Sequence, residues 1–444
     1  MEALTLTLFC LALASCVLLN FSIVYALIAG FFIFCLYGAR KGFSARQLGQ
    51  MALSGIATVK NILLVFLLIG MLTALWRACG TIPAIVCYFS GWIHPSVFVL
   101  MAFLLNCGVS SLTGTAFGTA ATMGVICMTM GAAMGVNPIL AGGAILSGVF
   151  FGDRCSPVST SALLVSTLTG TDIYANIRKM YLTALVPFAL TCAIYALLGL
   201  FSGASGATLD VWGLFSKHFS LPLVVLAPAA VILLLSAFKV NVKATMAVSI
   251  LLAFILCLTV QGMALKEVLL LLIAGYRVDD PLVAPMLNGG GIVSMLRVAA
   301  IVCISSSYAG IFKGTGLLER IKRTIAKLSD KITPFGAIVV TATLSSMIAC
   351  NQTLAIMLTH HVCGETVKEP ETLAIDLENS VVVISPLIPW SIACAVPLSA
   401  ISAPTASLLA ACFLYLLPAW HFLRQAARPA KDARPPKVEA PRPM

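Results

Sequence analysis

Charged residues are scarce in this chain: they make up 10% of its 444 residues, and only 16 residues are acidic. Hydrophobic residues make up 60%, and the mean hydropathy is +1.05. A soluble globular chain of this size could not bury so much apolar surface, so the composition indicates a polytopic membrane protein. A nucleotide-binding loop and a nucleophile–base arrangement are also missing outside the apolar segments, which argues against an enzyme.

Paired cysteine spacing is missing as well. The 15 cysteines are scattered through apolar segments, which is typical of small core residues rather than of disulfides or metal ligands. We therefore expect no cofactor, and no metal ion other than a transported Na⁺. The net charge of +11 comes from basic residues in short loops rather than along one domain face, so no nucleic-acid partner is expected.

Apolar runs of the length that a membrane-spanning helix needs, about 20 residues, recur along the chain. They lie near 3–19, 21–38, 58–76, 82–105, 181–200, 221–238, 244–262, 292–312, 333–350 and 398–418. We expect an all-α fold with roughly ten to thirteen crossings or half-crossings. The basic loops and the basic C-terminal tail would be cytoplasmic under the positive-inside rule, in a bacterial-type inner (plasma) membrane.

Polar breaks rich in glycine or proline interrupt these apolar runs in both halves of the chain. Unpaired backbone groups in lipid cost several kcal/mol each, so broken helices persist only where they are buried in protein or line a watered cavity. Matching broken helices in two halves are typical of secondary transporters. We expect some of these broken segments to form re-entrant hairpins. The breaks are Ser110–Thr115, Gly152–Pro157, Cys350–Thr353, and Glu378–Ser380 running on to Ser385 and Pro386.

The two halves also share a helix-end signature. Trp76–Gly80 and Phe312–Gly316 are offset by 236 residues (316 − 80 = 236), and each precedes a proline, an apolar helix and a break. The loop charges orient the two units oppositely, which predicts an inverted-topology repeat. The expected organisation is N-terminal helices and a cytoplasmic loop (1–54), a first repeat (55–240), a connecting helix and outward loop (241–291), a second, inverted repeat (292–420) and a disordered basic cytoplasmic tail (421–444).

Several motifs between about residues 55 and 420 resemble the NhaC-type Na⁺/H⁺ antiporters of the ion transporter superfamily. They are Gly152–Ser159, Gly170–Ile173, Ile177–Met180, Leu287–Ile292, Asn351–Ala355 through Glu365, and Glu378–Ser380 through Ser385–Trp390. The resemblance implies a fold with inverted repeats. It also implies exchange of Na⁺, or of Na⁺ with a small organic acid, against protons.

Two departures from that family pattern bear on proton coupling. The resemblance implies acidic residues at two positions where this chain has Thr160 and Asn379. Asp153 and Glu378 are then the remaining carboxylate candidates, and a buried carboxylate can bind either Na⁺ or H⁺. Two alternatives stand beside this role: Asp153 could form an internal ion pair with Arg154, and Glu378 could lie in a solvated loop.

Hydroxyl and amide side chains at the breaks are the further candidates for ion or substrate binding. Oxygen ligands and freed carbonyls suit Na⁺ or a polar substrate, although small residues such as Gly114-x-x-x-Gly118 also allow close helix packing. His360 or His361 could respond to protons, since the reference pKa of histidine is about 6.5. The candidates are Ser110, Ser111, Thr113, Gly114 and Thr115 at one break, Asn351, Gln352 and Thr353 opposite, and Ser156, Ser159, Thr160, Asn379 and Ser385 in addition.

Two functions are compatible with these residues. The first is an NhaC-type Na⁺/H⁺ antiporter that works by alternating access around a site near the bilayer midplane. The alternative is a Na⁺- or H⁺-coupled carrier or exchanger of a small organic anion or amino acid. The length of the family resemblance favours the first, and the loss of two carboxylates favours the second. The partners expected are small ions or a small organic substrate and the lipid bilayer, and a homodimer is compatible with the sequence.

Overall fold

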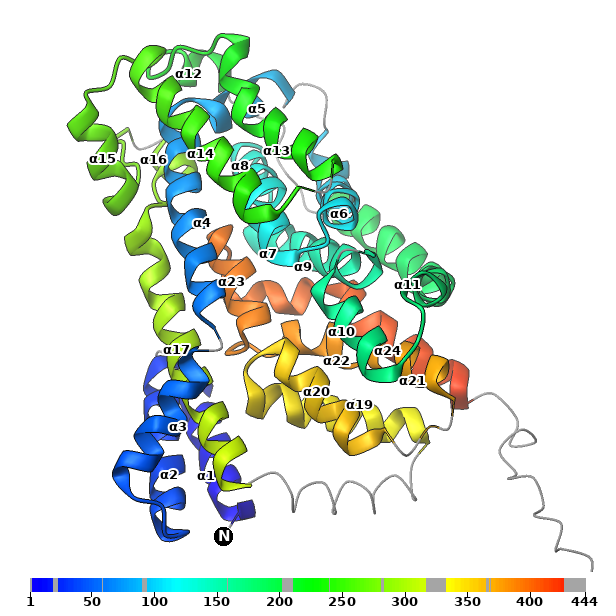
Figure 1. Cartoon of the computed structure of the whole chain (residues 1–444). Helices are drawn as coiled ribbons and strands as arrows, with labels where there is room; N and C mark the ends of the chain where they lie inside the picture. Colours follow the sequence, from blue (N-terminus) through cyan, green and yellow to red (C-terminus); the bar gives the residue numbers. More distant parts are fainter. Residues whose placement is uncertain are drawn as a thin grey trace, which may run out of the picture.

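The computed structural model describes residues 2–18, 23–57, 59–89, 94–157, 159–201, 211–238, 240–280, 283–316, 333–364, 367 and 369–426. These residues form a bundle of helices, as Figure 1 shows. Within them the β-structure is limited to one isolated bridge between Tyr276 and Gly289. The expectation of an all-α polytopic fold is confirmed.

The first half of the chain contains long helices, two of which are followed closely by a short one. It comprises α1 (Glu2–Leu18), α2 (Ile23–Arg40), α3 (Ala45–Ala57), α4 (Lys60–Ala78), α5 (Thr81–Phe89), α6 (Pro95–Thr113), α7 (Ala116–Thr119), the π-helical turn η2 (Ala120–Gly124), α8 (Val125–Ala133), α9 (Pro138–Cys155), α10 (Thr160–Thr169) and α11 (Ile173–Phe201).

The second half has more short helices. It comprises α12 (Val211–Phe215), η3 (Leu223–Leu226), α13 (Ala227–Ala237), α14 (Val242–Thr259), α15 (Leu265–Ala274), α16 (Ala284–Leu287), α17 (Ile292–Thr315), α19 (Pro334–Ala349), α20 (Gln352–Cys363), α21 (Pro370–Glu378), α22 (Val381–Ile384), η4 (Ser385–Leu387), α23 (Ile392–Ala400), η5 (Thr405–Ala410) and α24 (Cys412–Ala426).

Four helical stretches in the described residues are long and apolar enough to cross a membrane, and bent helix pairs raise this to six. Shorter apolar helices, including α14 and α19, add further candidates, so the total of ten to thirteen crossings stays a prediction. The four are Pro95–Thr113, Ala116–Ala133, Ile173–Leu200 and Ile292–Phe312.

Two expected spans are wrong. The run at 82–105 is divided between α5 and α6, because His94 precedes a proline and takes an extended conformation (ψ 137°). The run at 398–418 is interrupted by Ser402, which has a positive φ of 56°, and by Pro404. The last helix, α24, therefore begins at Cys412 and continues to Ala426, past the boundary expected at 420.

The helices α4 and α17 run side by side in opposite directions (Figure 1). Gly70 of α4 packs on the backbone of Gly291, whose N–H donates to the Gly70 carbonyl at 2.8 Å. Further along, Gly55 of α3 meets Gly310 of α17. Residue numbers thus rise along one partner while they fall along the other, as the inverted repeat predicts.

The breaks in the two halves have the same backbone geometry. Gly114 and Cys350 both take left-handed conformations, with φ of 64° and 54°, and both end a helix that begins with a proline. Thr115 and Asn351 follow with extended conformations and cap the next helix. The offset between the breaks is again 236 residues (350 − 114 = 236). The shared offset and backbone geometry agree with the repeat that the sequence predicts, and the bounds of the two repeats stay a prediction.

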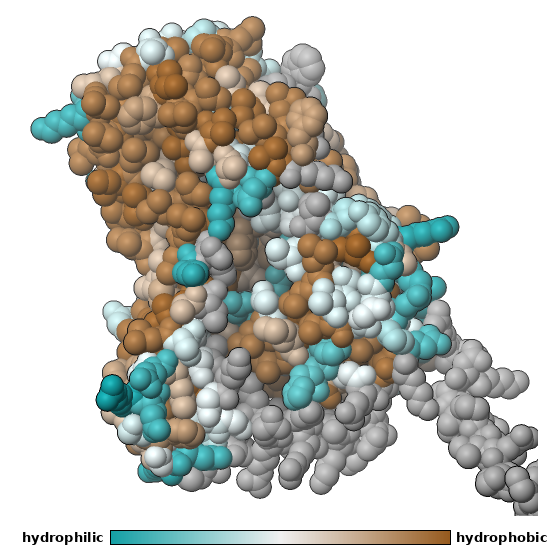
Figure 2. Space-filling view, in the orientation of Figure 1, coloured by the Kyte–Doolittle hydropathy of each residue, from teal (hydrophilic) through white to brown (hydrophobic). Residues whose placement is uncertain are grey.

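Close packing between α6 and α9 holds the first break in place. A Cβ added to Gly148 would lie 2.6 Å from the Phe103 carbonyl oxygen, and one added to Gly152 would collide with the backbone of Ser110 and Ser111. Small residues at Gly148 and Gly152 therefore let these helices approach closely. Away from this core, Figure 2 shows a broad apolar face over the upper part of the molecule, which suits contact with lipid. Large apolar side chains such as Leu234 of α13 and Leu251 of α14 are exposed.

Candidate functional site

Asp153 lies in the last turn of α9 and is 5% exposed. After the break, Ser159 caps α10, and its hydroxyl donates to Asp153 Oδ1 at 3.2 Å. The hydroxyl of Ser161 donates to Asp153 Oδ2 at 3.1 Å. Ser161 was not identified from the sequence, although its place in the first turn after the break is a local signal for it. The break thus folds two hydroxyls back onto one carboxylate.

Asp153 also faces both breaks at Gly114 and Cys350. The backbone of Ala116, at the start of α7, and the side chain of Gln352, at the start of α20, interact with its carboxylate. The amide nitrogen of Gln352 also donates to the Val382 carbonyl at 2.9 Å. The first residues of two helices, one from each half of the chain, therefore lie near one acidic side chain.

The neighbouring Arg154 points away from Asp153. Both residues are described, and no ion pair joins them; instead the Arg154 guanidinium donates to the Met180 carbonyl at 3.2 Å, to Thr183 Oγ1 at 3.1 Å and to Asn379 Oδ1. Arg154 Nε has no hydrogen-bond partner among the described residues. The alternative of an Asp153–Arg154 ion pair is therefore wrong.

Glu378 ends α21 and is fully buried, so its placement in a solvated loop is wrong. Neither carboxylate oxygen has a hydrogen-bond partner within the part of the chain that the structure describes. Its carboxylate interacts electrostatically with Arg154 and with Asp153. A buried, ionised carboxylate without hydrogen bonds is costly, so this group needs a proton, a cation or a rearranged neighbour.

Asn379 follows Glu378 and connects Arg154 to a second buried acid. Its Nδ2 lies 3.1 Å from His421 Nδ1, and His421 Nε2 lies 2.7 Å from Asp376 Oδ1. Gln425 Nε2 also donates to Asp376 Oδ1, at 3.0 Å. Asp376, His421 and Gln425 could not be identified as a group from the sequence, because the last two lie in the segment predicted to be a disordered tail. Residues 421–426 are helical instead, and residues 427–444 of that predicted tail lie outside the described residues.

The hydroxyls at the first break mainly satisfy the backbone. Ser110 donates to the Val149 carbonyl, and Ser111 donates to the Cys107 carbonyl at 2.8 Å. Thr113 bonds Thr119 through their hydroxyls at 2.9 Å, and Thr115 accepts from the Gly118 N–H as an N-cap. These side chains stabilise the break that positions Ala116 near Asp153.

The remaining candidates divide into buried and peripheral residues. Ser385 is buried, and its hydroxyl lies 2.8 Å from that of Ser346; Ser156, three residues after Asp153, is also buried. Asn351 caps α20 by accepting from the Thr353 N–H at 2.9 Å. Thr353 and Thr160 are exposed. The departure at Thr160 therefore lies outside the buried cluster, whereas the departure at Asn379 lies at its centre.

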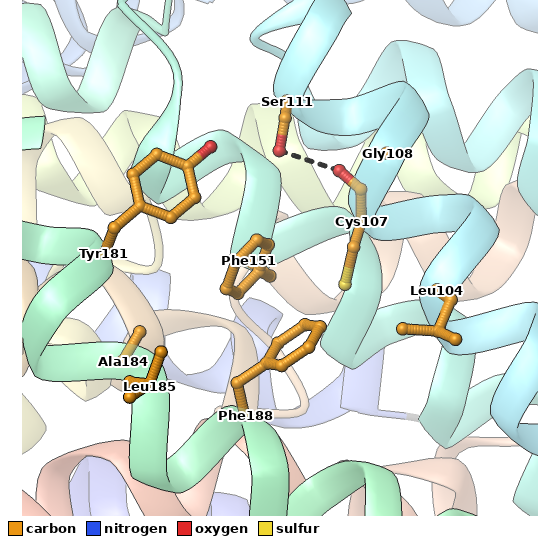
Figure 3. Close-up of a pocket in the computed structure, with 9 residues that line it drawn as sticks. All are labelled: Leu104, Cys107, Gly108, Ser111, Phe151, Tyr181, Ala184, Leu185 and Phe188. Atoms are coloured by element: carbon orange, nitrogen blue, oxygen red, sulfur yellow. Dashed lines mark hydrogen bonds between the residues drawn. The ribbon is translucent and has the colours of Figure 1, made fainter. Parts of the chain in front are cut away.

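A groove near the first break is lined in part by Ser111 and by none of the residues of the buried cluster. Figure 3 shows it between α6, α9 and α11, where Phe151 and Phe188 dominate its lining and Tyr181 and Ser111 are its polar edge. Its lining is otherwise apolar, which suits lipid tails better than an ion.

Comparison with known proteins agrees with this architecture. The profile of the Na⁺/H⁺ antiporter family matches residues 2–169 and 148–421. The malate-2H⁺/Na⁺-lactate antiporter of Bacillus subtilis is 28% identical over 396 residues, covering 86% of this chain and 84% of that protein. The Na⁺/H⁺ antiporter NhaC of Alkalihalophilus pseudofirmus is 27% identical over 344 residues, covering 73% and 72%.

A third similar protein is named for a different substrate. The arginine/ornithine antiporter ArcD of Halobacterium salinarum is 28% identical over 368 residues, covering 80% of this chain and 76% of that protein. These relatives are transporters, and the matched stretches contain both breaks and the buried cluster around Asp153 and Glu378. The chain is thus an integral membrane secondary transporter that belongs to the Na⁺/H⁺ antiporter family.

Proposed function

We propose that this chain exchanges Na⁺ for H⁺ at the buried carboxylates of Asp153 and Glu378. The observation that carries the proposal is the Glu378 carboxylate, whose two oxygens are buried without a hydrogen-bond partner among the described residues while Asp153 interacts with it electrostatically. Such a carboxyl group is stable when it holds a proton or when a cation replaces that proton.

Asp153 supplies the Na⁺ ligands in this proposal. Its carboxylate is joined by the hydroxyl oxygens of Ser159 and Ser161, and carboxylate and hydroxyl oxygens are hard ligands suited to a hard cation. The two hydroxyls now donate to the carboxylate, and they can turn their lone pairs to the ion when it binds. Proton and Na⁺ then compete for one cluster, which is the requirement for exchange.

Alternating access would follow from the inverted repeat. The broken helices of both halves meet at Asp153, so a movement of one repeat against the other exposes the cluster to one side at a time. We place the protein in a bacterial-type inner membrane with the C-terminus in the cytoplasm, because the basic loops and tail then obey the positive-inside rule.

A second candidate function is exchange of a small organic anion or amino acid. Two similar proteins carry such substrates in their names, and Arg154 offers a buried cation whose Nε has no described partner. A guanidinium binds carboxylates in a two-pronged geometry, so a substrate carboxylate could take this place.

Transport by the purified protein in proteoliposomes tests both functions. The experiment measures the dissipation of a pH gradient after addition of Na⁺, Li⁺ or K⁺. A second series adds malate, lactate or arginine instead. Asp172→Asn and Glu371→Gln are matched controls, since Asp172 is an exposed cap of α11 and Glu371 is exposed on α21. Na⁺-dependent flux that Asp153→Asn and Glu378→Gln abolish supports exchange at this cluster. Flux only with an organic substrate supports the second function.

A further inference from the structure

We propose that His421 and Asn379 couple proton uptake to the pairing of Arg154 with Glu378. In this proposal the Asn379 amide rotates when His421 takes up a proton, and the rotation releases Arg154. Both are positioning residues, because they act on the ion site through Arg154. This inference rests on the proposed function, since it assigns the proton path of that exchange. His421, Asn379 and Asp376 are all buried, at 8%, 0% and 1% exposure.

The hydrogen bonds of the network have one consistent direction. A guanidinium only donates, so Asn379 must present Oδ1 to Arg154 and its amino group to His421. His421 Nδ1 then accepts from Asn379, and Nε2 carries the hydrogen that is donated to Asp376 Oδ1 at 2.7 Å. The geometry thus describes neutral His421 with its hydrogen on Nε2.

A second proton on His421 is incompatible with this arrangement. Protonated Nδ1 would face the amino group of Asn379 at 3.1 Å, so two donors would oppose each other. Rotation of the Asn379 amide restores a bond to His421, but it turns the amino group towards Arg154. The guanidinium then loses its acceptor on Asn379.

Glu378 is an acceptor that Arg154 does not use in this structure. The two side chains interact electrostatically but form no ion pair within the described chain, and the two oxygens of Glu378 have no hydrogen-bond partner there. Pairing with the released guanidinium favours ionised Glu378. A proton that arrives on His421 therefore promotes the release of the proton held by Glu378, and the two events are linked reciprocally.

The groups around His421 add no competing charge apart from Asp376. Gln425, on the same helix, lies 3.3 Å from His421 Nε2, and α19 contributes the Phe335 ring, whose centroid lies 4.5 Å from the imidazole. The other helices packed against α24 are α9, α11 and α22.

The charged residues of these three helices do not contact His421. Arg154 of α9 is separated from His421 by the Asn379 amide, and Asp153 of α9 accepts from Ser159 and Ser161. Lys179 of α11 pairs with Glu371 at the start of α21, and Arg178 of α11 is exposed. Helix α22 is apolar, and Arg424 of α24 is exposed. Asp376 is thus the acid that directly contacts His421, and the charged residue of α24 itself, Arg424, lies on the exposed side of that helix.

The amide at position 379 is essential to this coupling. An aspartate there would accept from Arg154 and from protonated His421 at the same time, so no rotation would be needed.

Two measurements test the inference. The first is the pH profile of Na⁺-dependent flux in proteoliposomes for His421→Gln, with His94→Gln, at an exposed position just before α6, as the control. We expect His421→Gln to retain its maximal flux within about threefold, a change below 1 kcal/mol, and to flatten the pH profile of the native chain. A profile that matches the native chain and His94→Gln overturns the inference.

The second measurement does not depend on transport. The titration of His421 is followed by ¹⁵N-histidine NMR of the full chain in detergent, with His421→Gln to assign the signal. In Glu378→Gln we expect the midpoint to fall by about one pH unit, because protonated His421 loses the linked gain from Arg154–Glu378 pairing. In Asn379→Asp we expect it to rise. Equal midpoints in the native chain and Glu378→Gln overturn the inference, whereas absence of Na⁺ flux in the native chain overturns only the proposed Na⁺ exchange.

Discussion

The two breaks that meet at Asp153 have the same backbone geometry but different residues. In the first half Gly114 adopts the left-handed conformation at no steric cost, whereas in the second half Cys350 adopts it despite its Cβ. Cys350 is fixed by its surroundings: its carbonyl accepts from the Ile392 N–H at 2.8 Å, and its thiol lies 3.3 Å from Tyr308 Oη. The comparison teaches that packing can impose on one half the geometry that a local residue favours in the other.

The halves also contribute different chemistry to the cluster. The first half provides Asp153 with two hydroxyl donors, while the second half provides Glu378 with none among the described residues. A symmetric backbone thus presents an asymmetric pair of acids. This asymmetry suits a division of labour in which Asp153 binds the cation and Glu378 carries the proton.

The largest effect is expected from removal of either acid. Asp153→Asn and Glu378→Gln should each lower Na⁺-dependent flux by about a hundredfold or more, as expected for a buried charge interaction of about 3 kcal/mol. The asymmetry predicts a further difference in ²²Na⁺ binding to the purified protein at high pH. Asp153→Asn should abolish binding, and Glu378→Gln should retain it. Equal loss in both variants would remove the division of labour.

The next largest effect is a loss of stability when the close contact between α6 and α9, which supports the first break, is disturbed. Gly152→Ala should destabilise the protein by about 1–3 kcal/mol, because its methyl group collides with the backbone of α6. Gly108→Ala is the control, since a Cβ at Gly108 meets nothing within 4 Å. Thermal unfolding in detergent measures both. Similar unfolding temperatures for the two variants would contradict the close α6–α9 contact.

Substitutions at the two left-handed residues, Gly114 and Cys350, should have smaller effects on stability and compare the two breaks directly. Gly114→Ala should cost about 1–2 kcal/mol, because alanine is strained in the left-handed region. Cys350→Gly should be near neutral, because relief of strain offsets the lost contacts of the thiol. Cys394→Gly, at a buried position inside α23, is the control and should destabilise by about 1 kcal/mol or more. If Cys350→Gly destabilises as much as this control, Cys350 is not strained.

The smallest effects are expected on the apparent affinity for Na⁺, where the neighbouring residues Ser161 and Thr160 of α10 should differ. Ser161→Ala should weaken the apparent affinity for Na⁺ by about tenfold, the equivalent of one hydrogen bond to a charged group. Thr160→Ala and Thr160→Asp should leave it unchanged, because Thr160 is exposed. The Na⁺ concentration at half-maximal flux is the readout. A clear effect of Thr160→Asp would bring that position back into the ion site.

Much of the fold was predictable because its signals are local. Proline at the start of α6 and α19, and a polar residue after each left-handed position, mark the helix ends within a few residues. The spans at 82–105 and 398–418 were wrong for a local reason as well: a proline and a positive φ interrupted runs that hydropathy alone joined. Of the site, Asp153 and Glu378 could be proposed because acids are rare in apolar segments.

The sequence by itself determined that the chain is an apolar, helical membrane protein with two matching, broken units. Composition and short-range patterns carry that information. Only the tertiary structure decided that Arg154 turns from the adjacent Asp153 to Asn379, 225 residues away, and that His421 reaches Asp376. Such pairings depend on which helix faces pack together, because a buried polar group takes whichever partner the packing brings within reach, whatever the distance along the chain.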